Sequence, residues 1–310
     1  MGQDIDVDRF CPNPTDDLYW NESVWFSFSI PERGVHGMVY YMVRPNMNKM
    51  MGGPILWDES GAHMWDCLYH DWHPLQPIPA GAQKFDLKTD TSLEVRVIEP
   101  RKAYRLGYDA HGFKLDITWT ALDVPHHFLG MEIEAVGQTA DNRMHFEQMG
   151  RAVGRAELHG EVFEFDSFAL RDCSWGTRRI DGVKRGSYFW AIASEETAFH
   201  AQTTGDGDEQ RVVGGFLRLN GKTASLVGGE RVVTRMGRYA PESFTLALED
   251  ELGRTARITA RPRSDLTFNA FPRVQVIWSL LEADFGDGVT GWGDIQEFQP
   301  LEMFRQMVRG

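Results

Sequence analysis

The chain has 310 residues, of which 42% are hydrophobic and 25% charged, as in an ordinary folded globular protein. This length permits one large domain or two domains of about 150 residues each. A formal net charge of −13 argues against a nucleic-acid partner and against an anionic membrane surface, because both select clusters of lysine and arginine.

The cysteines, the first residues and the length of the apolar stretches bear on where the protein is located. The 3 cysteines form no CxxC pair and no even disulfide set, which favours a reducing compartment. The first residues are polar and acidic, without the basic and apolar regions of a secretory signal. No apolar stretch approaches the roughly 18 residues that a membrane helix needs. We therefore expect a cytoplasmic protein with no membrane insertion.

Period-two alternation of apolar and polar residues dominates the chain and predicts β-strands. A single helical pattern occurs, after Pro300, where Leu301, Phe304 and Val308 would share one face of a short helix. The segment 47–79 alternates poorly, and we expect long irregular connections around a short strand or two. The alternating segments are 93–97, 113–119, 131–135, 244–248 and 256–260, the last two joined as a hairpin.

A faint duplication suggests two halves. An aromatic strand followed by a turn and further strands opens residues 24–44 and again residues 187–218. We place the boundary near residue 155, which gives an N-terminal β domain over 1–155 and a C-terminal β domain over 156–310. No Pro- or Ser-rich linker marks this boundary, so we expect the halves to pack tightly.

The segment 57–73 gathers three histidines, four carboxylates and three tryptophans. A carboxylic acid against an apolar aromatic wall can stay protonated near neutral pH and donate its proton, while a nearby histidine relays a proton or activates water. The candidates for this acid–base chemistry are Asp58, His63, Asp66 and His70. On a strand, His63 and Asp66 would face opposite sides, so the four converge only if the chain bends.

Two other interpretations of the same segment stay open. The pattern H-x2-D-x3-H-D-x-H, from His63 to His73, offers nitrogen and oxygen ligands for zinc, iron or manganese. Its spacing matches no standard ligand pattern, and we predict no metal. The plainest alternative is a polar loop with aromatic anchors.

The most specific string is RDCSWGTR, from Arg171 to Arg178. Gly176 permits a sharp turn, and Trp175 offers an indole face and an N–H donor. Asp172 is either held by a neighbouring arginine or faces a cavity as an acid. The alternative is a buried ion pair that fixes a corner of the fold.

This string resembles the RD-x-SWG-x-R signature of the carotenoid 1,2-hydratase (hydroxyneurosporene synthase)-like family. The segment WNES from Trp20, the string HFEQ from His145, and Gly291-Trp292-Gly293 with Glu297 are also similar to segments of that family. The chain departs from the signature at Cys173, where the family has His or Arg, and at Thr177, where it has Pro.

The resemblance implies an all-β protein of two lipocalin-like antiparallel β-barrel or sandwich domains enclosing an apolar chamber, with RDCSWGTR in the C-terminal one. Family members add water to isoprenoid double bonds, and more distant lipocalin-like relatives catalyse cyclisations. The resemblance also implies chemistry without an organic cofactor.

Nucleotide-binding and α/β-hydrolase signatures are missing from the sequence. We therefore predict a cofactor-independent lyase or isomerase of hydratase, dehydratase or cyclase type, acting on a hydrophobic terpenoid-, steroid- or polyketide-like molecule. Asp172 or Asp58 would be the acid, and His63 or His145 the base or water-positioning group. A non-catalytic carrier of a hydrophobic metabolite is the rival function, and edge strands would support a homodimer. Substrate-binding residues would be Trp57, Trp65, Tyr69, Trp72, Trp175 and Arg178.

Overall fold

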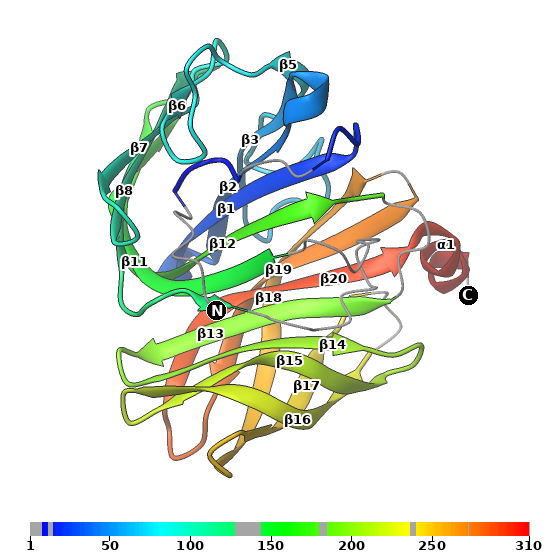
Figure 1. Ribbon diagram of the computed structural model, residues 1–310. Helices are drawn as coiled ribbons and strands as arrows, with labels where there is room; N and C mark the ends of the chain where they lie inside the picture. Colours follow the sequence, from blue (N-terminus) through cyan, green and yellow to red (C-terminus); the bar gives the residue numbers. More distant parts are fainter. Residues whose placement is uncertain are drawn as a thin grey trace.

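Two antiparallel β units lie against each other in the computed structural model (Figure 1). The structure describes residues 8–11, 15–127, 144–179, 185–235, 240–271 and 273–309. The expected all-β fold with two barrel- or sandwich-like units is confirmed, as is the short C-terminal helix. No helix within these ranges is long and apolar enough to cross a membrane.

The first unit is a curled 12-stranded sheet in the order β4-β3-β2-β1-β12-β11-β9-β8-β7-β6, with β5 on β3 and β10 on β11. Short 3-10 turns at Pro31–Arg33 and Pro45–Met47 join the first three strands. The strands are β1 (Trp20–Ile30), β2 (Val35–Arg44), β3 (Lys49–Trp57), β4 (Tyr69–His70), β5 (His73–Pro77), β6 (Leu87–Lys88), β7 (Glu94–Glu99), β8 (Ala103–Ala110), β9 (Phe113–Ala121), β10 (His126–His127), β11 (Met144–Leu158) and β12 (Glu161–Thr177).

The second unit is a closed eight-stranded barrel in sequential order, and α1 (Leu301–Arg309) follows its last strand. Closure leaves this unit without free sheet edges. Its strands are β13 (Gly186–Ser194), β14 (Thr197–Thr204), β15 (Glu209–Leu219), β16 (Lys222–Thr234), β17 (Ser243–Asp250), β18 (Thr255–Phe271), β19 (Val274–Asp284) and β20 (Thr290–Pro300).

The expected strands at 93–97, 113–119, 244–248 and 256–260 fall within or largely within β7, β9, β17 and β18. The expected strand at 131–135 lies outside the described residues. The sheets change between Thr177 and Gly186 rather than near residue 155, because β11 and β12 form one long hairpin paired over fifteen positions. RDCSWGTR therefore lies in the first sheet, although the sequence placed it in the second half.

Side chains on alternate positions form three apolar clusters. One fills the inside of the curled sheet and another fills the barrel. The third joins the two units, with Trp25 and Trp57 from the sheet against Trp190 and Trp278 from the barrel. Strand β1 is buried along its whole length because one face belongs to the first cluster and the other faces the barrel. Aromatic and aliphatic side chains thus occupy the interior of both units.

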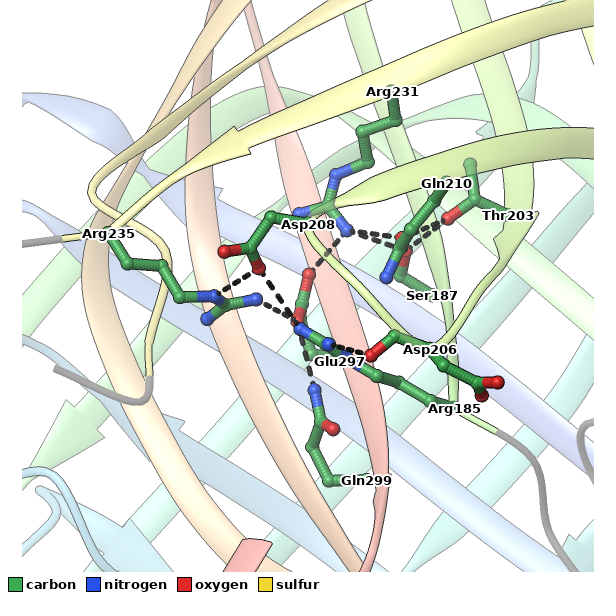
Figure 2. Close-up of polar contacts among 10 residues, drawn as sticks. All are labelled: Arg185, Ser187, Thr203, Asp206, Asp208, Gln210, Arg231, Arg235, Glu297 and Gln299. Carbon is green, nitrogen blue, oxygen red and sulfur yellow. Dashed lines mark hydrogen bonds and ion pairs between the residues drawn. The ribbon is translucent and has the colours of Figure 1, made fainter. Parts of the chain in front are cut away.

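One end of the barrel interior is charged (Figure 2). Arg231 and Glu297, both fully buried, form an ion pair at 2.5 Å. Arg235 reaches Glu297 at 3.3 Å and Asp208 at 2.9 Å, and Arg185 also contacts Asp208. The polar groups thus complete one end of a barrel whose middle is apolar.

Candidate functional site

The described residues place a buried polar cluster between the two units, on the face of β11 and β12 that looks toward the barrel. The two strands pair in the register Glu147–Asp172 and His145–Ser174. Alternation sends His145 and Glu147 to one face of β11, while Phe146 between them enters the core of the sheet. The strand pairing therefore brings the imidazole and the two carboxylates together.

Glu147 lies between two histidines. Its Oε1 is 2.8 Å from Nε2 of His145 and 3.3 Å from Nε2 of His200, which β14 of the barrel contributes. Burial would raise the pKa of Glu147, but His200 and His145 outweigh it and hold that pKa below its usual range. Burial likewise opposes charge on His145, yet the hydrogen bond to Glu147 raises the pKa of its imidazole. The geometry favours an ionised carboxylate shared by the two imidazoles.

Asp172 has the opposite protonation preference. Burial and the negative charge of Glu147 raise its pKa from 3.8 to about 8, against the influence of His145 and Arg178. Its Oδ1 has no hydrogen-bond partner among the described residues. Asp172 is partly exposed, whereas His145, Glu147 and His200 are buried. A carboxylic acid that is still protonated at neutral pH thus lies in the interface, with one oxygen buried and unpaired among the described residues.

Arg178 and two serines form a second polar group near Asp172. Arg178 donates from Nη2 to Oγ of Ser174 at 2.7 Å, and that hydroxyl is 2.7 Å from Oγ of Ser23. The positive charge of Arg178 also acts to lower the pKa of Asp172, against the effect of burial. Asp172, Ser174 and Arg178 all come from the RDCSWGTR string. They are separated by even numbers of residues along β12 and just beyond its end, so their side chains lie on the same face.

Partly exposed aromatic rings border the cluster. Tyr188 of the barrel lies edge-on to His145, with ring centroids 6.0 Å apart. Tyr40 of the sheet stacks on Trp72 at 5.4 Å. Deeper in the same interface, His36 contacts Asp294 at 3.0 Å. The cluster thus has an apolar, aromatic surround suited to a hydrophobic ligand.

A cleft of about 400 Å³ lies further along the same seam between the units. Its walls include Phe168 of β12, Ile192 of β13 and Trp292 of β20. On β12, Leu170 lies between Phe168 at the cleft and Asp172 at the cluster. On β13, Trp190 lies between Ile192 at the cleft and Tyr188 at the cluster, and both Leu170 and Trp190 are buried. The interface is therefore polar at one end, filled in the middle and hollowed at the other.

The polar cluster also has the composition of a metal site. Ligand atoms of His145, Glu147 and Asp172 all lie within 4.8 Å of one another. The direct hydrogen bond from His145 to Glu147 and the protonated state of Asp172 already balance the charges of these three groups. With Asp172 protonated and the ionised Glu147 hydrogen-bonded to His145, the three groups can act as an acid–base group.

The structure brings together some of the residues that the sequence suggested. His145, Asp172 and Arg178 meet at the cluster, and Trp57 and Trp72 lie in the same interface. Trp175 and Tyr69 instead face the core of the first sheet. Strand alternation explains the difference for Trp175, because it lies three positions from Asp172 and so points to the opposite face.

The loop candidates form a separate region. Asp58 accepts from the backbone N–H of Ser60 at 2.8 Å, and Asp66 accepts from that of His63 at 2.6 Å. His63 stacks on Trp65, whose side chain is 80% exposed. Burial lowers the pKa of His70, which favours its neutral form. The hydrogen bonds of Asp58 and Asp66 shape turns within the loop.

Two residues of the cluster were not anticipated. Glu147 stands two positions after His145 in the HFEQ string, so alternation along one strand could have paired them. His200 comes from the barrel, and its approach depends on how the two units pack. Nothing in the local sequence of β14 indicates that contact.

We predict that the shifted pKa of Asp172 makes stability depend on pH. The folded state holds a proton on Asp172 up to about pH 8, whereas the unfolded chain releases it near its ordinary pKa of 3.8. This contribution to the free energy of unfolding is therefore fully present below the unfolded pKa and lost as pH rises through the folded one. Urea unfolding across this range should show the decline in wild type but not in Asp172→Asn. Asp166→Asn, an exposed ion-paired site on the same strand, should retain it.

Several solved structures share this fold at low sequence identity. Kievitone hydratase from Nectria haematococca is 12% identical with a TM-score of 0.56, over 92% of this chain and 90% of that one. An AttH from Nitrosomonas europaea is 14% identical with a TM-score of 0.57, over 94% and 97%. CghA is 11% identical with a TM-score of 0.52, over 94% and 93%. The chain therefore shares its fold with these proteins.

No curated protein sequence matches the chain. A family model described as "Domain of unknown function (DUF7064)" matches residues 6–301 and so spans both the curled sheet and the barrel. The chain belongs to the DUF7064 family.

Proposed function

We propose that the protein is a lyase or isomerase of hydratase, dehydratase or cyclase type, with its active site between the curled sheet and the barrel. The observation that carries this proposal is the pairing of Asp172, a protonated acid with an unpaired oxygen, with the buried His145–Glu147–His200 group. Proteins named as a hydratase and as CghA have the same fold, which supports the reaction class. The substrate would be a hydrophobic terpenoid-, steroid- or polyketide-like molecule.

Asp172 acts as the general acid. Adding water across a double bond begins with protonation of an alkene carbon, and loss of water begins with protonation of the leaving hydroxyl. Both steps need a donor that keeps its proton at neutral pH and lies near the substrate. Asp172 meets the first requirement through its raised pKa, and its place in the interface with Oδ1 unpaired among the described residues supports the second.

The Glu147 group acts as the proton acceptor. Its Oε2 is buried and has no hydrogen-bond partner among the described residues, which leaves it free to accept a hydrogen bond from a group that enters the interface. His145 and His200 hold the other oxygen and keep the carboxylate ionised. Asp172 and Glu147 thus have separated pKa values, as an acid and a base working in one reaction require.

The aromatic surround provides the binding surface. Tyr40, Trp72 and Tyr188 offer apolar area beside the acid, and each is partly exposed. Ring faces also attract positive charge that develops on a protonated alkene. A carrier would need the same surface but would have no use for two carboxylates with opposite protonation states.

The test is incubation of the purified protein with panels of terpenoid, steroid and polyketide compounds, followed by mass spectrometry. We expect at least one compound to gain or lose the mass of one water or to return as an isomer. The product should form at least about 100-fold more slowly with Asp172→Asn. Compounds that bind but are recovered unchanged from wild type across all three panels would support the carrier instead.

A further inference from the structure

A second group of potential ligands lies away from the proposed active site, at the margin of the first sheet. Asp71 and His73 flank Trp72 on the connection from β4 to β5, and His111 lies in the turn between β8 and β9. Ligand atoms of these three side chains all lie within 4.8 Å of one another. None of the three belongs to the His145–Glu147–His200 group or to its aromatic surround.

The three side chains come from parts of the sheet that are far apart in its strand order. Strands β4 and β5 pair with β3 at one edge of the sheet, whereas β8 lies near the other edge, with most of the strands between them. The sheet curls so that these two parts approach each other. The hydroxyls of Tyr69 and Tyr108 are 2.6 Å apart across this junction, and Tyr69 stacks on Phe113 at 4.3 Å.

The junction also fixes the Asp71 carboxylate. Its Oδ1 is 2.7 Å from Nε2 of His73, and its Oδ2 accepts a hydrogen bond from the hydroxyl of Tyr108. The backbone N–H of Asp71 donates to the carbonyl of Pro54 at 3.1 Å. The hydrogen bond from Tyr108 is of the kind that orients ligating carboxylates in metal sites, because it comes from a group behind the ligand.

The ligand set suits a divalent transition metal. Two imidazoles and one carboxylate are ligands that Zn²⁺ commonly takes, with a fourth position left for water. Asp71 and His73 are partly exposed and His111 is exposed, so an ion can reach them from solvent. Mg²⁺ and Ca²⁺ prefer oxygen ligands and fit two imidazoles poorly.

We propose that Asp71, His73 and His111 bind a divalent transition-metal ion, with Zn²⁺ the best match, and that the ion clamps the two margins of the curled sheet. Binding would be weaker at acid pH, because both imidazoles must be unprotonated to act as ligands. The site is independent of the proposed acid–base chemistry.

Titration of the full-length protein with Zn²⁺ tests this, by calorimetry and by the thermal unfolding temperature. We expect one Zn²⁺ per chain and an unfolding temperature that rises with Zn²⁺ but not with Mg²⁺, since a ligand that binds the folded state stabilises it. His73→Ala and His111→Ala should each weaken binding about tenfold or more. The thermal shift should disappear with them.

His63→Ala is the matched control, because His63 also lies beside a carboxylate, Asp66, at 3.4 Å, but no third potential ligand joins this pair among the described residues. It should bind Zn²⁺ as wild type does. His145→Ala separates this site from the buried cluster. Zn²⁺ binding that survives both His73→Ala and His111→Ala, or that is lost in His145→Ala, would overturn the proposal. Unfolding temperatures without metal show whether each variant folds.

Discussion

Asp172→Asn should lower turnover by about 100-fold to 10,000-fold while leaving substrate binding nearly unchanged, because an amide of the same shape cannot donate the proton. The change removes an acidic proton that burial and Glu147 hold in place up to about pH 8. Steady-state kinetics and a direct binding measurement on the same substrate separate the two effects. A comparable loss in binding affinity would point to a positioning role instead.

The pH profile supplies a second readout of the same prediction. Wild-type turnover should be level near neutral pH and fall as pH rises through about 8, as Asp172 loses its proton. The pKa of Glu147 is lowered, so the base should stay ionised across this range. Asp166→Asn is the matched control, an exposed aspartate on β12 paired with Arg151. Unchanged activity in Asp172→Asn would reject the assignment.

Glu297→Gln should lower the free energy of unfolding by about 3–5 kcal/mol, the usual result of removing one partner of a buried ion pair. Glu297 is 1% exposed and pairs with Arg231, and it also meets Arg235 (Figure 2). Burial opposes its charge, but Arg231 and Arg235 hold its pKa below the usual range. The variant would leave the Arg231 guanidinium buried without its carboxylate.

Chemical denaturation measures this effect, and Glu282→Gln provides the comparison. Glu282 lies on the adjacent strand β19 and pairs with Arg263 at a partly exposed position, where loss of an ion pair costs about 0–1 kcal/mol. Arg231→Met combined with Glu297→Leu should recover part of the loss, because it removes both buried charges. Equal effects of Glu297→Gln and Glu282→Gln would show that the barrel pair adds little.

The two predictions assign different roles to two of the motifs that carried the family resemblance. Asp172, from RDCSWGTR, faces the interface between the units and is the proposed acid. Glu297, from the closing G-x-G-x-x-x-E, points into the barrel and balances buried arginines. Activity and stability measurements on both variants would separate chemistry from support of the fold.

The sequence by itself determined the fold class. Alternation such as that of 113–119 specifies a strand with one buried face, whatever its partners, so it could be identified locally. His145 and Asp172 were also found from local strings. The boundary near residue 155 was misplaced because β11 and β12 pair through a two-residue turn, and a turn between paired strands has the same local signals as a turn between domains.

Only the tertiary structure decided which titratable groups meet. His200 reaches Glu147 because the barrel packs on the sheet, a contact between residues far apart in the chain. The same packing raises the pKa of Asp172, since burial and a neighbouring charge depend on what surrounds a carboxyl group and not on its neighbours in sequence. The residues from Asp58 to His70 looked richer in chemistry, yet their carboxylates shape turns in a loop because their hydrogen-bond partners are local.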